Sequence, residues 1–532
     1  MGEPPTEQDD PPRFDVGSVP PIPDDPEAAR RLAARLAEPG AAGVVMHSTE
    51  AVRRFYRERD HQPAWTRQQR PTPGAIDTLR ALTRLPEHGL DPADYELEAL
   101  RFDGPVPDDP IELELRLTDM WLTVGAHMLR GRVDPVRIHP AWSAAARTTD
   151  LVEALERSLA QGTPGEALLS LAPAHPEYAA LQQALAELRL QAAEGPWPKL
   201  PRVTLPLAEG STGPAVAALR ARLARTDELA DPTGDQFDAE LAAAVRHFQG
   251  RHGLEPTGLV DAATRRALEV SLGDRIAQIE ANLERWRWLP EDLGRRHVRV
   301  NIAAFMVVLV EGHEHVLTMK AVVGKRYRKT PVFSTTIQAV TINPRWMVPP
   351  KLAVQDLLPE IKRDPTTIER KHLRVLDART GAVVDPASVP WSKLSTRHFP
   401  YLLRQDPGPD NALGRFKLVM PNDYDVYLHD TPKRHLFAED RRDRSSGCVR
   451  IQHPRDLSVA LLAGHPKWTP ARLDAAVAEG RELTIRLPEP VPIHILYWTA
   501  FVDDEGHLQL REDIYGRDAA LRAALAEGRG RG

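Results

Sequence analysis

The segment DRRDRSSGCVRIQHP, residues 440–454, contains Cys448, the only cysteine in the 532 residues. A cysteine nucleophile needs a base that removes the thiol proton and donors that hold the oxyanion formed when the sulfur attacks a carbonyl. Gly447 lets the backbone bend tightly, so that amide groups lie beside the sulfur, and the Ser445 and Ser446 hydroxyls can add contacts. We therefore predict that Cys448 is a nucleophile, with the Gly447 and Cys448 amides as its oxyanion hole.

A candidate base lies upstream of this cysteine. His429 is near the end of the strand-like stretch DVYLHD, residues 425–430, and a loop separates it from Cys448. Its imidazole can take the thiol proton and return it to a leaving amine. Tyr427 precedes His429 by two residues and so shares its strand face, where the hydroxyl either supports the oxyanion or the ring packs in the core.

Other side chains near the motif, together with Ser445, are candidates for substrate binding. Arg450 either binds a substrate carboxylate or braces the catalytic loop, and Trp346 either lines a substrate groove or packs in the core. Three further arginines form a basic run that we interpret as a solvated loop: Arg441, Arg442 and Arg444.

The sequence predicts no metal and no cofactor. A single cysteine excludes an intrachain disulfide and sites that need several thiolates. His435 and His453 flank the motif, but neither has metal-ligand spacing to a second histidine or cysteine. A glycine-rich phosphate loop after a strand is also missing from the pattern.

Composition indicates a folded protein of several domains. The chain has 532 residues, 42% of them hydrophobic and 27% charged, which is ordinary for globular proteins. A net charge of −6 argues against a nucleic-acid binder. The longest apolar run, residues 302–310, is about half of the roughly 20 residues that a membrane helix needs.

The N-terminal half reads as helical after a short tail. Residues 1–24 are acidic and rich in proline, which is typical of a disordered tail and unlike a secretory signal. Residues 25–200 repeat apolar positions at helical spacing and predict a scaffold domain. Residues 205–270 predict a three-helix unit, in which Asp261 is a candidate cap of the third helix.

The C-terminal half reads as strands. Residues 274–512 predict a β-rich catalytic domain, with a partly helical insertion at about 350–411 that could act as a lid. A hairpin is expected near the DDEG turn, residues 503–506, and residues 513–532 predict a frayed helical tail. The predicted fold class is therefore multidomain α+β.

Two parts of the chain resemble known families. Residues 205–270 resemble peptidoglycan-binding domain 1, on Val216, Leu219, Phe237, Ala244, Val245, Phe248, Gln249, Gly253, Leu254, Gly258, Asp261, Thr264 and Leu268. The motif from His429 to Arg450 resembles the YkuD-type L,D-transpeptidase signature, with Ser446 where many members have histidine. The segments GRVDP, NPRWMVPP, YRKTPVFS and YLHDTPKRHLFAEDRRDRSSGCVR are similar to the large YcbB-type subgroup, which joins scaffold, peptidoglycan-binding-like and capped catalytic domains.

The resemblance implies a reaction on peptidoglycan. Cys448 would attack the bond between diaminopimelate and the terminal D-alanine of a tetrapeptide stem, and a second diaminopimelate amine would resolve the thioester into a cross-link. It also implies that the backbone carbonyl of Asp430 orients His429. The implied partners are peptidoglycan, carbapenems as covalent inhibitors and other cell-wall synthesis enzymes, and the implied location is the periplasm despite the unusual N-terminus.

Two other readings share these residues. A cysteine hydrolase, or L,D-carboxypeptidase, would use water in place of the acceptor amine. A wall-binding scaffold with an inactive site would use neither water nor an acceptor amine. The intact His429, Gly447 and Cys448 argue against such a scaffold.

Overall fold

The chain folds into two compact units, which are described separately. In this computed structural model the described residues are 25–38, 46–68, 70–95, 109–226 and 228–527, so the predicted tail 1–24 lies outside them. One unit comprises Met1–Arg132, Arg147–Ala174 and Glu527–Gly532, and the other Val133–Ala146 and His175–Ala526. Within the described ranges, every helix is too short or too polar to span a membrane.

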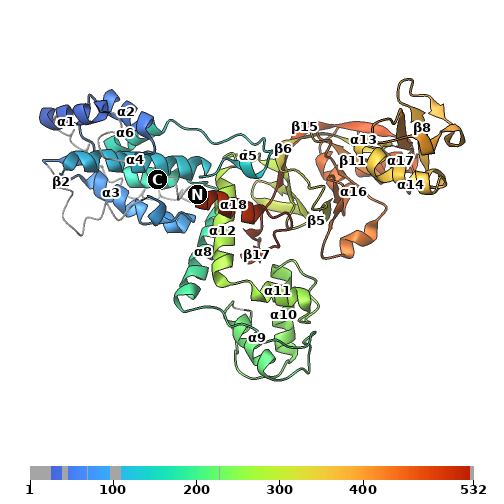
Figure 1. Cartoon of the computed structure of the whole chain (residues 1–532), viewed down its shortest axis with the longest axis horizontal. Coiled ribbons are helices and arrows are strands. Elements are labelled where there is room, and N and C mark those ends of the chain that lie inside the picture. The colour runs from blue at the N-terminus through green and yellow to red at the C-terminus, as the bar shows by residue number, and fades with distance from the viewer. Residues whose placement is uncertain (1–24, 39–45, 69, 96–108, 227, 528–532) are drawn as a thin grey trace, which may run out of the picture. The chain divides into compact units, whose positions relative to one another are not determined.

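The first unit is mainly helical, as predicted (Figure 1). Its elements are α1 (Pro26–Ala37), α2 (Thr49–Glu58), β1 (Thr66–Arg67), β2 (Arg70–Pro71), α3 (Pro73–Leu82), two 3₁₀ turns (Leu85–His88 and Pro92–Tyr95), α4 (Pro110–Arg130), α6 (Leu151–Gln161) and α7 (Pro164–Ser170). Glu114 of α4 is fully buried and accepts the amide hydrogens of Ala64, Trp65 and Thr66 at 2.6–2.8 Å. These bonds replace the water that the carboxylate loses.

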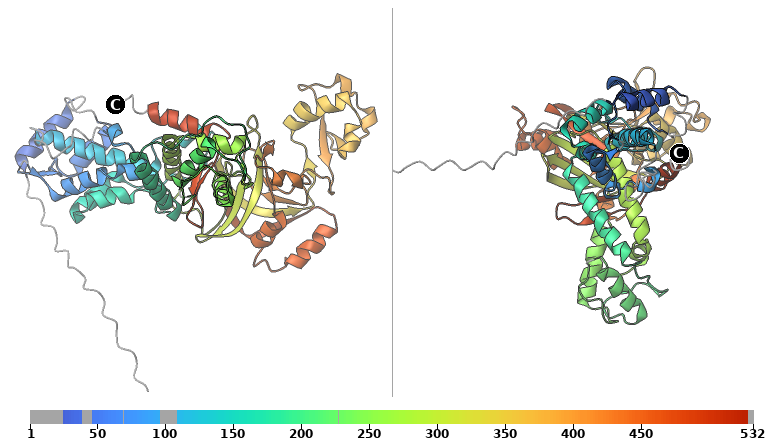
Figure 2. Two further views of the ribbon diagram at one scale, coloured as in Figure 1. Left: turned by 90° about the horizontal axis from the view of Figure 1, so that it is seen from below. Right: turned by 90° about the vertical axis from the view of Figure 1, so that its left-hand side faces the viewer.

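Two long helices and a three-helix unit form the helical part of the second unit. The helices are α5 (Pro135–Ile138), α8 (Pro176–Ala193), α9 (Pro214–Ala224), α10 (Ala239–Arg251), α11 (Ala262–Glu269) and α12 (Leu272–Arg287). Figure 1 and the right panel of Figure 2 show α8 and α12 side by side, with α9, α10 and α11 at one end of the pair. Asp261 caps α11 through the Thr264 amide at 2.8 Å, which confirms the predicted cap.

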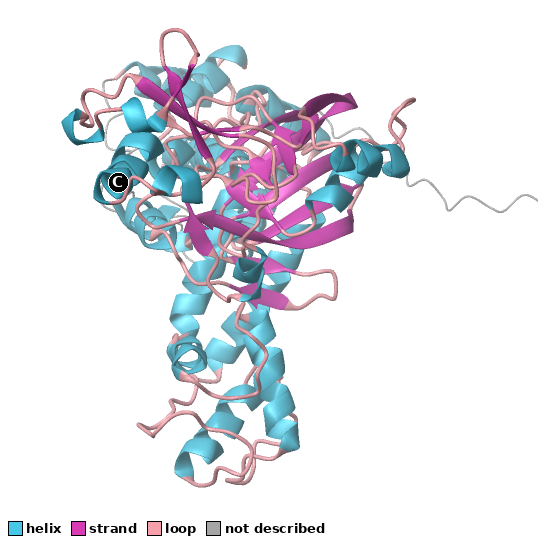
Figure 3. Ribbon diagram, turned by 90° about the vertical axis from the view of Figure 1, so that its right-hand side faces the viewer, coloured by secondary structure: helices cyan, strands magenta, loops and turns pink. Residues whose placement is uncertain are grey.

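A nine-stranded sheet forms the core of the C-terminal half of the chain (Figure 3). Its strands are β3 (Arg296–Asn301), β4 (Met306–Glu311), β5 (Glu314–Gly324), β6 (Phe333–Ile342), β11 (Phe416–Val419), β12 (Leu428–His429), β13 (Asp443–Ser445), β14 (Val449–Ile451) and β15 (Leu483–Leu496). The order is β13-β5-β14-β12-β11-β6-β15-β3-β4, and β4 also pairs with β5. Eight strands therefore close into a ring, which leaves few free edges. Helices α16 (Pro454–Leu461) and α17 (Pro470–Ala478) add Leu457, Leu461 and Leu473 to its core.

The predicted insertion is a lobe with its own sheet and core. Besides its helices it contains a four-stranded sheet of order β7-β10-β8-β9, which the sequence reading missed. The elements are β7 (Trp346–Met347), α13 (Pro350–Leu352), a π-helical turn (Ala353–Leu357), α14 (Leu358–Arg363), α15 (Thr367–Arg370), β8 (Leu373–Asp377), β9 (Val383–Val384), two 3₁₀ turns (Pro386–Ser388 and Trp391–Lys393) and β10 (Tyr401–Gln405). Figure 2 shows this capping lobe, coloured yellow to orange, beside the large sheet. We call residues 346–405 the cap.

The C-terminal segment differs from its prediction. The expected hairpin is present as β16 (Ala500–Val502) paired with β17 (Leu508–Leu510). Helix α18 (Arg517–Glu527), however, is not a frayed tail, because Leu521 is fully buried beside Trp288 and Val133. The prediction of fraying was wrong for these residues because their apolar positions have partners far away in the sequence.

A buried ion pair joins α12 to its surroundings. The Glu284 and Arg287 side chains are each 1% exposed, and their charged groups lie 2.7 Å apart. Glu284 also accepts the amide hydrogen of Val133 at 2.9 Å, and Arg287 donates to the Tyr178 hydroxyl at 3.2 Å. Each charge thus replaces part of the water that the other loses on burial.

Glu284→Ala should strongly destabilise the second unit. It leaves the Arg287 guanidinium buried without its carboxylate, a change that costs about 3–5 kcal/mol. Thermal unfolding followed by circular dichroism measures the loss. The matched control is Glu269→Ala, which removes a solvent-exposed partner of Arg265 and should change stability by less than about 0.5 kcal/mol. Equal melting temperatures for the two variants would contradict the prediction.

Candidate active site

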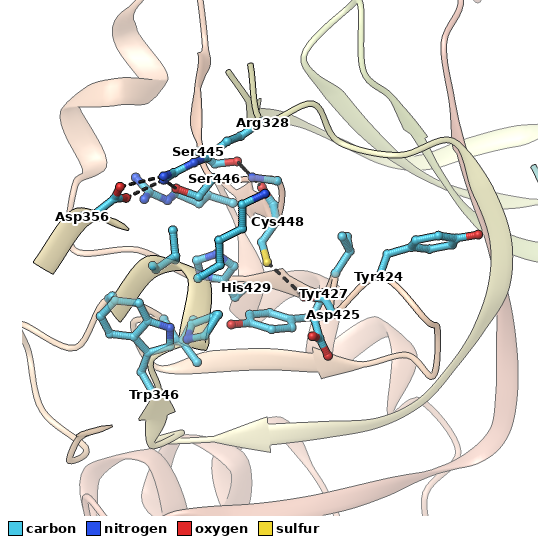
Figure 4. Close-up of a pocket in the computed structure, with 18 of the residues that line it drawn as sticks. Arg328, Trp346, Asp356, Tyr424, Asp425, Tyr427, His429, Ser445, Ser446 and Cys448 are labelled. Atoms are coloured by element: carbon cyan, nitrogen blue, oxygen red, sulfur yellow. Dashed lines mark hydrogen bonds and ion pairs between the residues drawn. The ribbon is translucent and has the colours of Figure 1, made fainter. Parts of the chain in front are cut away.

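One cavity of about 620 Å³ collects most of the residues singled out in the sequence. Both the large sheet and the cap line it (Figure 4). The predicted residues in its lining are Trp346, Tyr427, His429, Ser445, Ser446, Gly447, Cys448 and Arg450, and sequence reasoning missed Arg328, Asp356, Leu413 and Asp425 among the others. Asp430 is outside the lining but contacts His429 directly.

Strand pairing brings the cysteine and the histidine together. β12 and β14 are parallel neighbours, with Leu428 opposite Val449 and His429 opposite Arg450. The Val449 amide donates to the Tyr427 carbonyl at 3.1 Å, so Cys448 lies beside Tyr427 at the start of β14. Residues opposite one another share a sheet face, which places this group toward one cavity.

The turn before Cys448 is held by hydroxyl groups. Gly447 has φ +126°, a backbone conformation that favours glycine. The Ser445 hydroxyl accepts the Gly447 amide hydrogen at 3.1 Å and donates to the Cys448 carbonyl at 2.6 Å. From the other side, the buried Thr330 hydroxyl donates to the Gly447 carbonyl at 2.8 Å. The sulfur is therefore presented by a turn that is braced on both sides.

These bonds change the expected set of oxyanion donors. The Gly447 amide already donates to Ser445, whereas the Cys448 amide has no acceptor within the described part of the chain. The Cys448 amide is therefore the donor available for an oxyanion, and Ser445 holds the turn that aims it.

The histidine is oriented by a backbone carbonyl. His429 Nδ1 lies 2.5 Å from the carbonyl oxygen of Asp430, the partner that the family resemblance implied. A carbonyl only accepts, so Nδ1 carries the proton and Nε2 presents its lone pair. The Asp430 carboxylate is occupied elsewhere and accepts from the Arg415 amide at 2.8 Å. Gly414 permits this approach, because a Cβ there would meet the Asp430 side chain at 2.4 Å.

The cysteine and the histidine are both neutral at rest. Burial lowers the pKa of His429 to about 3, and the positive charge of Arg450 lowers it further. Burial also raises the pKa of the Cys448 thiol, against the hydrogen bonds of Tyr427 and the charges of Lys417 and Arg450. The thiol contacts the Asp425 carbonyl at 3.5 Å. Backbone hydrogen bonds with Asp430 and Leu413 act against burial and favour protonated His429. The site thus holds a thiol and a neutral imidazole in one cavity, where the imidazole can take the thiol proton.

Tyr427 and Trp346 form one wall of the cavity. The ring of Tyr427 lies 5.5 Å from that of His429, and Figure 4 shows its hydroxyl directed into the site, toward Trp346. Burial and the neighbouring Cys448 raise the pKa of the phenol, so it stays protonated and donates. Tyr427 therefore both lines the cavity and packs against the core of the large sheet.

Arg328 connects Ser446, in the turn before Cys448, to the cap. The Arg328 guanidinium binds both carboxylate oxygens of Asp356 in the cap, at 2.5 and 2.6 Å, and donates to the Ser446 hydroxyl at 3.3 Å (Figure 4). Arg328 belongs to the loop that joins β5 to β6. One arginine thus contacts two parts of the site that are distant in sequence.

The basic run contributes structure at the rim instead of lining the cavity. Arg441 pairs with Asp443 at 3.0 Å and Arg444 with Glu439 at 2.9 Å. Arg442 donates to backbone carbonyls, including that of Glu439 at 2.8 Å. The three side chains are therefore loop braces rather than a free basic patch. Among the described residues, no group of three or more His, Cys, Asp or Glu is placed to hold a metal ion.

Fold and site together define a multidomain α+β protein with a cysteine–histidine centre under a cap. Comparison with family models agrees: residues 295–468 match "L,D-transpeptidase catalytic domain", residues 50–185 match "Scaffold domain", and residues 212–268 match "Putative peptidoglycan binding domain". The chain thus contains an L,D-transpeptidase catalytic domain together with scaffold and peptidoglycan-binding domains, and the predicted α+β class is confirmed.

Three individual proteins are similar to parts of this chain. A "Putative L,D-transpeptidase" of Haemophilus influenzae is 34% identical over 247 residues, which are 46% of this chain and 49% of that protein. The matched region thus spans about half the length of this curated relative. An L,D-transpeptidase structure from Xylanimonas cellulosilytica is 16% identical, with a TM-score of 0.19, covering 56% of this chain and all of that one. L,D-transpeptidase 1 of Mycobacterium tuberculosis is 14% identical, with a TM-score of 0.15, covering 38% and 61%.

Alkylation of Cys448 should show that the resting pair is neutral. Iodoacetamide reacts with the thiolate, so the rate should rise from about pH 5 to about pH 9 without a plateau, since the thiol pKa is raised and His429 titrates only near 3. Mass spectrometry of the modified Cys448 peptide gives the rate at each pH. A pH-independent rate above about pH 6 would instead indicate a preformed thiolate–imidazolium pair.

Amide hydrogen exchange should show that Arg328 couples the cap to the turn around Ser446. Arg328→Ala removes the contacts to both Asp356 and Ser446, so amide exchange should speed up in Ala353–Leu357 and around Ser446 together. Arg374→Ala, which removes a partner of Asp406 elsewhere in the cap, is the control and should leave both segments unchanged. Faster exchange in the cap segment alone would show that the arginine does not couple them.

Proposed function

We propose that this protein is a peptidoglycan L,D-transpeptidase that uses a thioester intermediate. In the first step the Cys448 sulfur attacks the carbonyl that joins diaminopimelate to the terminal D-alanine of a tetrapeptide stem. The thiol proton passes to His429 Nε2 and then to the leaving amine, so that D-alanine departs and a thioester remains. In the second step the amine of another diaminopimelate attacks the thioester, His429 takes its proton, and the thiol is restored with a cross-link formed.

One observation carries the proposal: within a matched L,D-transpeptidase catalytic domain, Cys448 and an accepting His429 line one cavity. The Nδ1 bond to Asp430 supports His429 as the base, because it leaves Nε2 unprotonated. The Cys448 amide and the Tyr427 hydroxyl are the donors for the oxyanion. Ser445 and Gly447 hold the turn that places the Cys448 amide.

Arg450 is the proposed receptor for a substrate carboxylate. It is half-buried in the cavity lining, and the charge that favours its protonated form is that of Cys448. It forms no ion pair within the described part of the chain, so a substrate carboxylate would be its counter-charge. Trp346, in the same lining, is the proposed apolar wall of the substrate groove.

Peptidoglycan as the substrate fits the rest of the chain. Residues 212–268 match a peptidoglycan binding domain, which supports a role at the cell wall. We propose a periplasmic location on this basis, because stem peptides are cross-linked outside the inner membrane. Carbapenems, which contain an activated carbonyl, are proposed to acylate Cys448, and other cell-wall enzymes are proposed partners.

Turnover of a diaminopimelate tetrapeptide muropeptide tests the reaction. Mass spectrometry should detect a cross-linked dimer and free D-alanine, and Cys448→Ala should abolish both because the nucleophile is lost. The control is Lys467→Met, an exposed change outside the cavity, which should keep full activity.

The outcomes separate the alternatives. Release of D-alanine without a dimer would identify the protein as a carboxypeptidase and overturn transpeptidation. If neither product forms, or if Cys448→Ala matches the parent, the enzymatic proposal fails and the wall-binding scaffold remains.

A further inference from the structure

A lysine lies next to the catalytic pair without belonging to the cavity lining. Lys417 is on β11, which pairs with β12 so that Lys417 is directly opposite His429. His429 is in turn opposite Arg450 on β14. Directly opposite residues share one face of a sheet, so the three side chains form a row with the imidazole between two cations. We call these three residues the cationic row.

Lys417 is placed against the group that contacts the sulfur. Its Nζ lies 4.2 Å from the centroid of the Tyr427 ring, over which it makes a cation–π contact. The side chain is half-buried, and burial lowers the pKa of its ammonium group. The positive charge is therefore partly desolvated close to a nucleophile that must become negative.

Within the described part of the chain, anionic groups favour this charge, but none forms an ion pair with it. Cys448, Glu482 and Asp425 are the anionic groups that favour protonated Lys417. Glu482 is engaged by Arg345, accepting its amide hydrogen at 2.8 Å. Lys417 itself forms no ion pair within the residues that the structure describes. A desolvated cation without a partner is costly, and an anion that forms on the neighbouring sulfur would repay that cost.

We propose that Lys417 is a positioning residue that stabilises the Cys448 thiolate electrostatically and holds the Tyr427 ring against it. The inference rests on the proposed function for its role in turnover. The same charge also keeps His429 neutral, since a second positive charge beside Lys417 and Arg450 is unfavourable. The two cations of the cationic row therefore favour both the neutral form of His429 and the thiolate form of Cys448.

The groups that face this site define the pH dependence. From β12 they are His429, with Tyr427 just before the strand, from β14 Arg450, with Cys448 just before it, and from neighbouring loops Asp425 and Glu482. Removing the lysine charge destabilises the thiolate and so raises the pKa of the thiol. At a fixed pH below that pKa, less thiolate forms and the sulfur reacts more slowly.

Alkylation of Cys448 in Lys417→Met tests the electrostatic part. Methionine keeps an unbranched side chain without the charge, so the iodoacetamide rate near neutral pH should fall about tenfold, equivalent to about one pKa unit. Lys417→Arg keeps the charge and should restore most of the rate. Lys320→Met, an exposed change on β5 of the same sheet, should behave like the parent. An unshifted rate–pH profile in folded Lys417→Met would overturn the proposal.

Turnover of the muropeptide tests the catalytic part. Lys417→Met should lower kcat with little change in KM, because Lys417 is outside the cavity lining. If methionine prevents folding, as judged by thermal melting, Lys417→Gln replaces it in both assays. A parent that alkylates as expected but does not turn over muropeptide would refute the proposed function and leave the thiolate role standing. Normal turnover by a folded, uncharged variant would refute the role of Lys417.

Discussion

The parallel pairing of β12 with β14 is the constraint on which the site depends. It sets Cys448 beside Tyr427 and Arg450 opposite His429, although a loop separates the two segments in the chain. A shift of one residue would turn these side chains to the opposite face of the sheet. The closed ring of strands, and the buried residues that fill it, hold this register in place.

Electrostatics around the pair follow from the same register. Both the thiol and the imidazole are desolvated, so the pKa of Cys448 rises and that of His429 falls. Burial thus favours the neutral form of both groups. The positive charges of Lys417 and Arg450 act in the opposite direction on the sulfur and favour its thiolate form. Because the thiol pKa is raised, little of the resting sulfur is thiolate, which is the form that reacts.

The cap contributes its own wall to this site. It has a separate sheet and core, so it can hold its shape while its edge residues meet the large sheet. Arg328 joins the two through Asp356 and Ser446. Serine at position 446 therefore has a role that depends on the cap: it accepts from an arginine, where an imidazole would be bulkier and could itself be charged.

The sequence by itself determined the fold class, several local features and the candidate nucleophile. Its helical and strand periodicities predicted the α+β class, the helix-capping role of Asp261 and the hairpin near the C-terminus. The lone Cys448 after Gly447 indicated a candidate nucleophile. These signals are local, since a cap or a tight turn needs only neighbouring residues. Only the tertiary structure showed that the Gly447 amide already donates to Ser445, that α18 is buried and that residues 346–405 contain their own sheet. It also showed that Arg328 joins Asp356 to Ser446 and that Lys417 lies opposite His429. Each depends on contacts between segments far apart in the chain, and such contacts leave no periodic pattern in the residues that make them.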